Sequence, residues 1–85
     1  MTPIIATKRF GRQLSRLPRP ARDAVETALA KLARGAGSMK VLVAHTGLLE
    51  VRVTNHIRLI VELPASGPGL VVRSVGDHDV ILRRP

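Results

Sequence analysis

Two consecutive stretches of the chain alternate apolar and polar residues with a period of two, the pattern of a half-buried β-strand. The first covers residues 48–53 and the second residues 57–63, with only residues 54–56 between them. A connection this short predicts a β-hairpin. We expect one face of it to enter the core; that face carries Leu49, Val51 and Val53, then Ile57, Leu59, Val61 and Leu63.

The apolar face also fixes how the two strands pair. Both sets of apolar residues reach one face only if Val53 lies opposite Ile57 and Arg52 lies opposite Arg58, because a slip of one residue would turn one strand over. Two arginines facing each other on the solvent side repel. An anion such as a phosphate between the two guanidiniums would remove that repulsion. The alternative is a pair of solvated surface arginines that only aid solubility.

Before the hairpin, the pattern predicts one strand and two helices. Residues 3–7 form a short apolar stretch that we expect to be the first strand, and Thr7 is the expected N-cap of a helix over residues 8–17. The apolar stripe of this helix consists of Phe10, Leu14 and Leu17. A proline-rich joint leads to a second amphipathic helix that ends at Gly35. Helices joined so briefly are expected to form an antiparallel hairpin.

The remaining segments complete an α+β domain. In residues 36–47, which lack a clear period, we expect residues 41–43 to lay an apolar plug under the sheet. Residues 70–75 are the expected last long strand, and residues 76–79 and a short apolar tail follow it. The order is one strand, two helices and a three-stranded antiparallel sheet. This order predicts a single two-layer domain over residues 1–85, with the helices on the apolar face of the sheet and the first strand returning to it.

The composition limits the class of protein. The chain has 85 residues and contains no Trp, Tyr or Cys, so aliphatic side chains must build a small core. The lack of cysteine fits a reducing compartment, and no apolar run approaches the roughly 18 residues that span a bilayer. The N-terminus lacks the apolar region of a signal peptide. We therefore expect a cytoplasmic protein that does not enter a membrane.

The charge is strongly positive and uneven. The 14 Lys and Arg residues against 6 Asp and Glu give a formal net charge of +8, which predicts a nucleic acid or an acidic protein segment as partner. Many basic residues precede the first acidic residue, Asp23, and no aromatic residues lie among them, so we expect contacts to phosphates or carboxylates. Arg9, Arg12 and Arg16 share one face of the first helix and are candidates for phosphate binding. A solvated face without a ligand is the alternative.

Other chemistries find less support in the sequence. His45, His56 and His78 lack the paired spacing of zinc ligands. The serines stand outside any nucleophile elbow, and the Gly-Pro-Gly segment at residues 67–69 lacks the lysine and the following helix of a phosphate loop. We therefore expect neither a metal ion nor a cofactor.

The ordered pattern as a whole resembles the RelE/ParE superfamily of bacterial type II toxins. The residues that carry the resemblance are Phe10, Leu14 and Leu17-Pro18, then Val25, Leu29 and Leu32, and finally the stretches 47–53, 57–61 and 75–79. Together they cover nearly the whole chain. The resemblance implies a RelE-like fold and a toxin that is held by a cognate antitoxin, for which we expect an acidic or amphipathic binding segment.

The resemblance also implies an activity. Members that are ribonucleases cleave messenger RNA, usually on the ribosome and without a metal. The reaction is attack of a ribose 2′-hydroxyl on the adjacent phosphate, which needs cations around the phosphoryl oxygens and groups that carry protons. The basic residues of such members correspond here to Arg52, Arg58 and His78, which become the candidate catalytic residues. An imidazole can exchange a proton near neutral pH, which suits His78 for acid–base work. His56 and Arg73 are additional candidates for substrate binding. A polar turn without a catalytic role is the alternative for residues 76–79.

Several residues depart from the ribonuclease pattern. Many such enzymes carry a Tyr near the C-terminus, where this chain has Ile81, and second-strand lysines, one of which is replaced by Glu50. Because the sequence stops at Pro85, we expect no C-terminal helix. These departures keep two other functions open: a ParE-like inhibitor that contacts DNA gyrase without catalysis, and a non-toxic nucleic-acid- or protein-binding module, such as a domain of a larger helicase-like protein.

Overall fold

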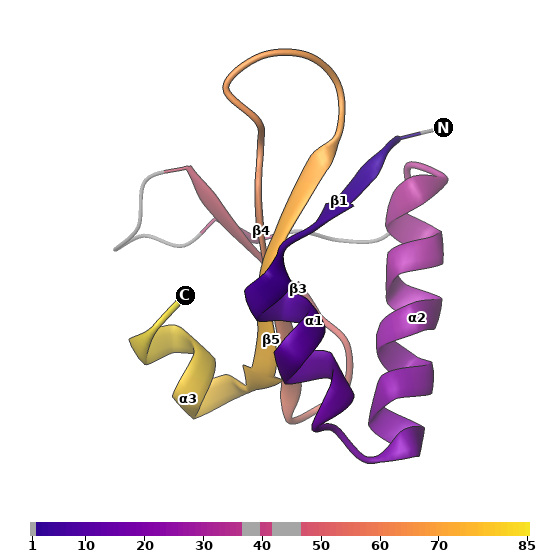
Figure 1. The fold of residues 1–85 in the computed structure, drawn as a ribbon, viewed down its shortest axis with the longest axis vertical. Coiled ribbons are helices and arrows are strands. Elements are labelled where there is room, and N and C mark those ends of the chain that lie inside the picture. The colour runs from indigo at the N-terminus through magenta and orange to yellow at the C-terminus, as the bar shows by residue number, and fades with distance from the viewer. Residues whose placement is uncertain (1, 37–39, 42–46) are drawn as a thin grey trace.

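The computed structural model describes residues 2–36, 40–41 and 47–85. The elements in chain order are β1 (Ile4–Ala6), α1 (Lys8–Ser15), α2 (Arg19–Ala33), β2 (Lys40–Val41), β3 (Leu48–Arg52), β4 (Ile57–Glu62), β5 (Leu70–Asp77) and α3 (His78–Arg83). The strands form one sheet in the order β1-β5-β4-β3-β2. Figure 1 shows α2 and α3 on opposite sides of the strands. The predicted α+β fold is confirmed. No helix in the described ranges is long and apolar enough to cross a membrane.

The sheet is antiparallel except at one edge. β1 pairs in parallel with β5, Ile4 lying opposite Leu70, so the first strand returns to the sheet as predicted. Between β4 and β5 the register shifts, because Ile60 lies opposite Ser74 whereas Val61 lies opposite Val72. Arg73 is therefore the extra residue of a β-bulge, which bends the strand locally and re-aims side chains.

The starts and ends of the first two helices follow local chemistry. Thr7 caps α1, since its hydroxyl accepts a hydrogen bond from the Phe10 N–H. α1 ends at Ser15 rather than at residue 17, because the ring of Pro18 disfavours helical backbone just before it. Pro20 occupies the first turn of α2, where a missing N–H costs nothing. α1 and α2 run in opposite directions, as expected of a helical hairpin (Figure 1).

The hairpin register is the one that the alternating pattern predicts. Arg52 lies opposite Arg58 in the pairing of β3 with β4. The Val53 N–H donates a hydrogen bond to the Ile57 carbonyl, which closes the turn. Leu63, expected on the apolar face, is instead 61% exposed, because β4 ends at Glu62 and Leu63 lies beyond the pleat that would have turned it inward.

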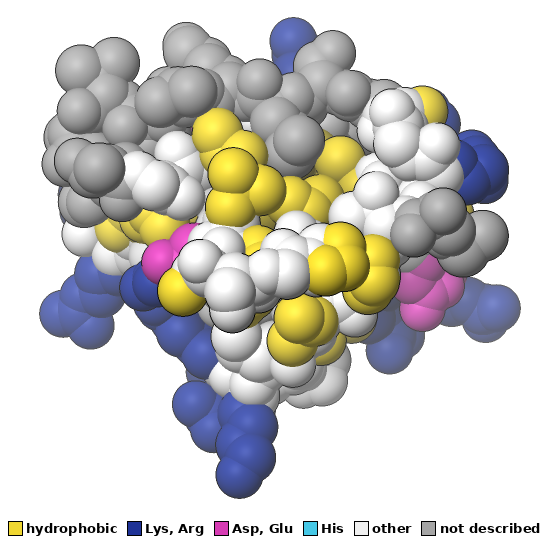
Figure 2. Space-filling model, turned by 90° about the horizontal axis from the view of Figure 1, so that it is seen from above, with side chains coloured by type: hydrophobic (Ala, Val, Ile, Leu, Met, Phe, Trp, Pro, Cys, Tyr) yellow, Lys and Arg dark blue, Asp and Glu magenta, His cyan; other side chains and the backbone are white. Residues whose placement is uncertain are grey.

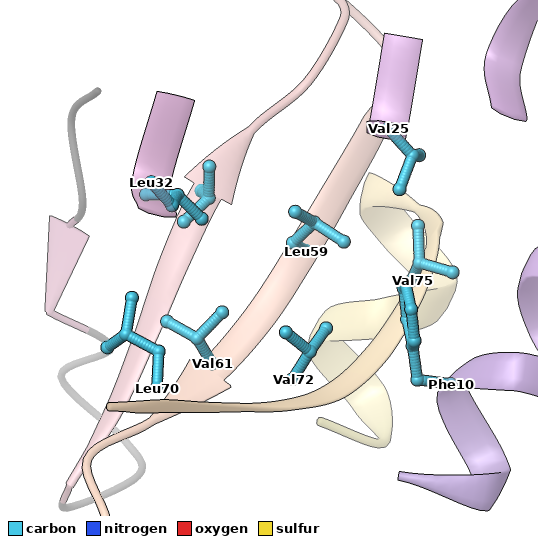
Figure 3. Packing of buried hydrophobic residues seen from close by; sticks show 9 residues of the cluster. Phe10, Val25, Leu32, Leu59, Val61, Leu70, Val72 and Val75 are labelled. Atoms are coloured by element: carbon cyan, nitrogen blue, oxygen red, sulfur yellow. The ribbon is translucent and has the colours of Figure 1, made fainter. Parts of the chain in front are cut away.

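The main core lies between the sheet and the first two helices. Figure 3 shows Val25 and Leu32 of α2 and Phe10 of α1 directed towards the side chains of the strands. The buried cluster consists of Phe10, Val25, Leu32, Val51, Leu59, Val61, Leu70, Val72 and Val75. Burying this apolar area is the dominant favourable contribution to folding.

The opposite face of the sheet, called the α3 face below, is partly apolar, which the sequence analysis did not anticipate. Leu48 and Ile60 are buried there against Ile81 of α3. The expectation that the C-terminal segment forms no helix was wrong, since Asp77 caps α3 by accepting a hydrogen bond from the Asp79 N–H. β2 was also missed; it pairs with β3 and adds a strand to the predicted sheet. Of the expected apolar plug, residues 42–43 lie outside the described residues, as does His45.

Candidate functional site

The three candidate catalytic residues come together at one end of the α3 face, beside the turn of the β3–β4 hairpin. Arg52 and Arg58 are cross-strand partners. Arg58 also lies opposite Gly76 of β5. His78 follows at the start of α3, and its backbone N–H donates a hydrogen bond of 2.7 Å to the carbonyl of His56 in the turn. The fold thus places all three, with His56, around one turn.

Arg58 is held by several contacts and is largely buried. Its Nε lies 3.4 Å from Oε1 of Glu50, and the two side chains are 12% and 13% exposed. Its Nη1 donates to the backbone carbonyls of Thr54 and Ile57. A guanidinium fixed in this way needs no further ordering to meet an anion, so little side-chain entropy would be lost on binding.

Arg52 differs in its surroundings. Its side chain is exposed, and Nη2 donates to the Oδ1 of Asn55 in the turn. The two guanidiniums therefore each have a partner from the protein. From the sequence, a bound anion was expected to relieve the repulsion between Arg52 and Arg58. In the structure Glu50 offsets this repulsion, since it lies on the same face and diagonally across from Arg58.

His78 is accessible and stands next to a carboxylate. Its side chain is 42% exposed, and its Nδ1 lies 3.5 Å from Oδ1 of Asp79. Because Asp77 occupies the N-cap position, His78 is fixed at the first turn of α3. The imidazole is thus reachable from solvent, as an acid–base group requires.

Glu50 is the site residue that the sequence analysis assigned no role. In the sequence it stands where the ribonuclease pattern has a lysine, and it was interpreted only as a departure from that pattern. The signal for its role was present in the register, since Glu50 and Arg58 fall on the same face of neighbouring strands one pleat apart. A diagonal cross-strand pair at that spacing is within reach of long side chains.

The other candidate phosphate-binding residues lie away from this turn. Arg73 is at the β5 bulge, and its Nη1 lies 3.4 Å from Oε1 of Glu62; both side chains are 39% exposed. Arg9 and Arg73 line one hollow of about 170 Å³, and Arg9 donates through Nη2 to the carbonyl of Arg84 at 2.6 Å. Arg12 and Arg16 are exposed near the C-terminal end of α1.

Two further hollows lie at other edges of the fold. One of about 300 Å³ runs between α2 and β3 and is bounded by Lys31 and Arg52. Another of about 250 Å³ is largely apolar and includes Leu32, Leu63 and Leu70. Figure 2 looks onto the end of the molecule that carries the β4–β5 loop, where apolar side chains gather at the centre and Lys and Arg project around the rim.

Solved structures with the same fold come from toxin–antitoxin complexes. The RelB-RelE antitoxin–toxin complex from Methanococcus jannaschii contains a chain that matches with a TM-score of 0.74 and 14% identity, over 95% of this chain and 99% of that chain. The toxin–antitoxin complex RelBE2 from Mycobacterium tuberculosis gives a TM-score of 0.69 and 22% identity, over 91% and 98%. A chain of the E. coli DinJ-YafQ toxin–antitoxin complex matches with a TM-score of 0.71 and 11% identity, over 94% of this chain and 96% of that chain.

These matches rest on structure and not on sequence. No family model and no curated protein matches the sequence. Nearly the full length of each matched chain is covered, so the likeness extends to the whole arrangement of helices and sheet rather than to one motif. The chain has the fold of RelE-type toxins.

Proposed function

We propose that this protein is the toxin of a type II toxin–antitoxin system and that it cleaves messenger RNA on the ribosome without a metal ion. The observation that carries the proposal is the grouping of Arg52, Arg58 and His78 around the β3–β4 turn. The fold adds support, since the matched chains come from complexes named as toxin–antitoxin complexes. The net charge of +8 favours a polyanionic substrate.

The reaction assigned to this site is an internal transfer of the phosphoryl group. The 2′-oxygen of a ribose attacks the adjacent phosphorus, the bond from phosphorus to the 5′-oxygen of the next nucleotide breaks, and a 2′,3′-cyclic phosphate and a free 5′-hydroxyl result. Negative charge grows on the phosphoryl oxygens along this path. We assign the stabilisation of that charge to Arg58, which Glu50 and two backbone carbonyls hold, and to the exposed Arg52 as a second cation.

One proton must leave the 2′-hydroxyl and another must reach the 5′-oxygen. We assign proton delivery to His78, whose imidazole is accessible beside the turn. We assign proton uptake to Glu50, because its carboxylate lies 3.4 Å from Arg58, the residue proposed to hold the phosphoryl group. Glu50 would then both position Arg58 and act as the base.

An antitoxin is the proposed protein partner. The apolar hollow that includes Leu32, Leu63 and Leu70 gives an amphipathic segment a place to bury its apolar side chains. The basic rim around that end favours an acidic segment and should speed association at low salt (Figure 2). Binding that is equally fast at low and high ionic strength would contradict this electrostatic steering.

One observation favours the second candidate, a ParE-like inhibitor that contacts DNA gyrase without catalysis. Glu50 neutralises the cation that the ribonuclease would need most, and the chain has no Tyr to position a substrate. In this alternative Arg52 and Arg58 belong to a docking surface.

Induction in bacteria followed by primer extension on translated messages separates these functions. The ribonuclease predicts growth arrest with new RNA ends for the wild type, and loss of those ends for His78→Ala. Arg34→Gln, an exposed charge at the end of α2, is the matched control and should cleave like the wild type. Growth arrest without new RNA ends, but with trapped gyrase–DNA complexes, would contradict the ribonuclease and support the gyrase inhibitor. The absence of growth arrest would favour a binding module.

A further inference from the structure

A second cluster of charged side chains lies on the α3 face, at the end of β4 opposite the hairpin turn. Arg9, Glu62 and Arg73 line the hollow of about 170 Å³ there, together with Thr7 and Val71. The hollow is separated from Arg58 by the apolar cluster of Leu48, Ile60 and Ile81. Glu62 follows Arg58 by four positions on β4, which corresponds to about 13 Å along the strand.

The fold brings the two arginines together through Thr7. The Thr7 hydroxyl lies 2.9 Å from the carbonyl of Val72 and 3.1 Å from that of Arg73, so it ties the start of α1 to the β5 bulge. Because the same hydroxyl caps α1, Arg9 in the first turn of that helix lines the same hollow as Arg73. The first turn of α1 contains no acidic residue, so the positive end of the helix dipole is not offset there.

Arg73 is only partly satisfied by its contacts. Its Nη1 meets Glu62 at 3.4 Å, a long contact for a charge-assisted hydrogen bond. Its Nε is the buried side-chain nitrogen that lacks a hydrogen-bond acceptor among the described residues. A buried donor without an acceptor costs free energy, and in a native structure it calls for an explanation.

We propose that Arg9 and Arg73 form a second phosphate-binding site, which takes a phosphodiester of the same RNA strand away from the bond that is cleaved. A phosphate has enough oxygens to accept from the Nη groups of Arg73 and from the N–H groups of Arg9, and it would reach the buried Nε only if the Arg73 fork turned outward. Glu62 is the competitor, since a phosphate that enters must share or displace its hold on Arg73. The inference rests on the proposed function, because it takes RNA as the ligand.

This arrangement gives the substrate two points of attachment. The site at Arg58 would hold the phosphate that reacts, while the site at Arg73 would fix the direction of the strand. α3 lies between them: His78 begins it beside the turn, and Arg84, just beyond its end, is bound by Arg9. A six-residue helix is about 9 Å long, a span that a few nucleotides can cover.

The test is the binding of a short single-stranded RNA in which every 2′-hydroxyl is methylated, followed by fluorescence anisotropy at several salt concentrations. Methylation removes the nucleophile, so the binding result stands whether or not the protein cleaves RNA. Arg73→Gln should weaken binding about tenfold, as expected for losing a charged hydrogen bond. It should also reduce the slope of log K against log salt by about 0.7. The control, Arg22→Gln on α2, removes the same charge from the other side of the sheet.

A second pair of variants makes the opposite prediction. Glu62→Gln removes the competing carboxylate and should tighten binding more than Glu26→Gln, which changes the net charge equally on exposed α2. An Arg73→Gln effect no larger than that of Arg22→Gln would overturn the second site. Weaker RNA binding by Glu62→Gln than by the wild type would also overturn the second site. Altered RNA cleavage by itself would bear only on the proposed function.

Discussion

The two ends of the α3 face carry the same chemistry in different surroundings. Each has an Arg–Glu pair with a separation of 3.4 Å, Arg58 with Glu50 at the hairpin turn and Arg73 with Glu62 at the bulge. The side chains of the first pair are 12% and 13% exposed, whereas those of the second are both 39% exposed. An equal distance therefore does not mean an equal energy, because burial decides how strongly water screens the charges.

The difference suggests different roles for the two ends. A mostly buried pair cannot lose one partner without leaving an uncompensated charge, so Glu50 and Arg58 act as one rigid unit. A half-exposed pair contributes little to stability, and its carboxylate can give way to another anion at small cost. The buried end suits chemistry that needs fixed groups, and the exposed end suits reversible binding of a substrate.

The largest effect is expected on stability at the buried end. Glu50→Ala should lower the free energy of unfolding by about 3 kcal/mol, because it leaves Arg58 buried without its counter-charge. Glu62→Ala, the matched change at the exposed end, should cost less than about 1 kcal/mol. Urea denaturation of both variants measures the two values. Equal losses would show that burial does not distinguish the pairs.

The next effect concerns catalysis with the charge retained. Arg58→Lys keeps a cation near Glu50 but loses the planar fork that reaches Glu50 and two backbone carbonyls. Cleavage of a translated message should fall about a hundredfold, the usual cost of losing one preorganised contact to the transition state. Arg52→Lys, at the exposed cross-strand position, serves as the control and should change the rate far less. If Arg52→Lys proved as damaging, the rigidity of Arg58 would not be what matters.

A smaller effect should appear on loosening the exposed end alone. Thr7→Ala removes the cap of α1 and its link to the bulge, and should cost about 1 kcal/mol of stability. It should also weaken binding of methylated RNA, because the start of α1, which carries Arg9, is then no longer tied to the bulge at Arg73. Thr27→Ala removes a hydroxyl that donates to the Asp23 carbonyl within α2, and the RNA affinity of this variant should match that of the wild type. Equal RNA affinities for the two variants would contradict the role given to Thr7.

The pairing of the hairpin could be predicted from the sequence because it depends on a strict period of two over both strands. A one-residue slip would have turned one strand over and buried either Arg52 or Arg58, so the apolar face alone determines the register. The same reasoning could not predict where the guanidiniums point. Their partners, Glu50 for Arg58 and Asn55 for Arg52, depend on diagonal neighbours and on the shape of the turn.

Other features were beyond the reach of periodicity. α3 has six residues, too few to show a helical period, although Asp77 before an apolar run was an available N-cap signal. The bulge at Arg73 leaves no mark in the alternation, yet it determines that Arg73 meets Glu62 and lies beside Arg9. The candidate site was thus half predictable: its strands and its two arginines followed from the pattern, but the role of Glu50 and the separate position of Arg9 and Arg73 required the structure.

The most direct test of the central claim is a translation reaction with purified protein and a message that carries one 2′-O-methyl group at the mapped cleavage position. If the buried end performs attack by the ribose 2′-oxygen, the unmodified message is cut to give a 5′-hydroxyl end, and the methylated message stays intact at that position. Equal cleavage of both messages would contradict the assigned reaction. An intact unmodified message, under conditions in which the protein still arrests growth, would contradict the ribonuclease itself.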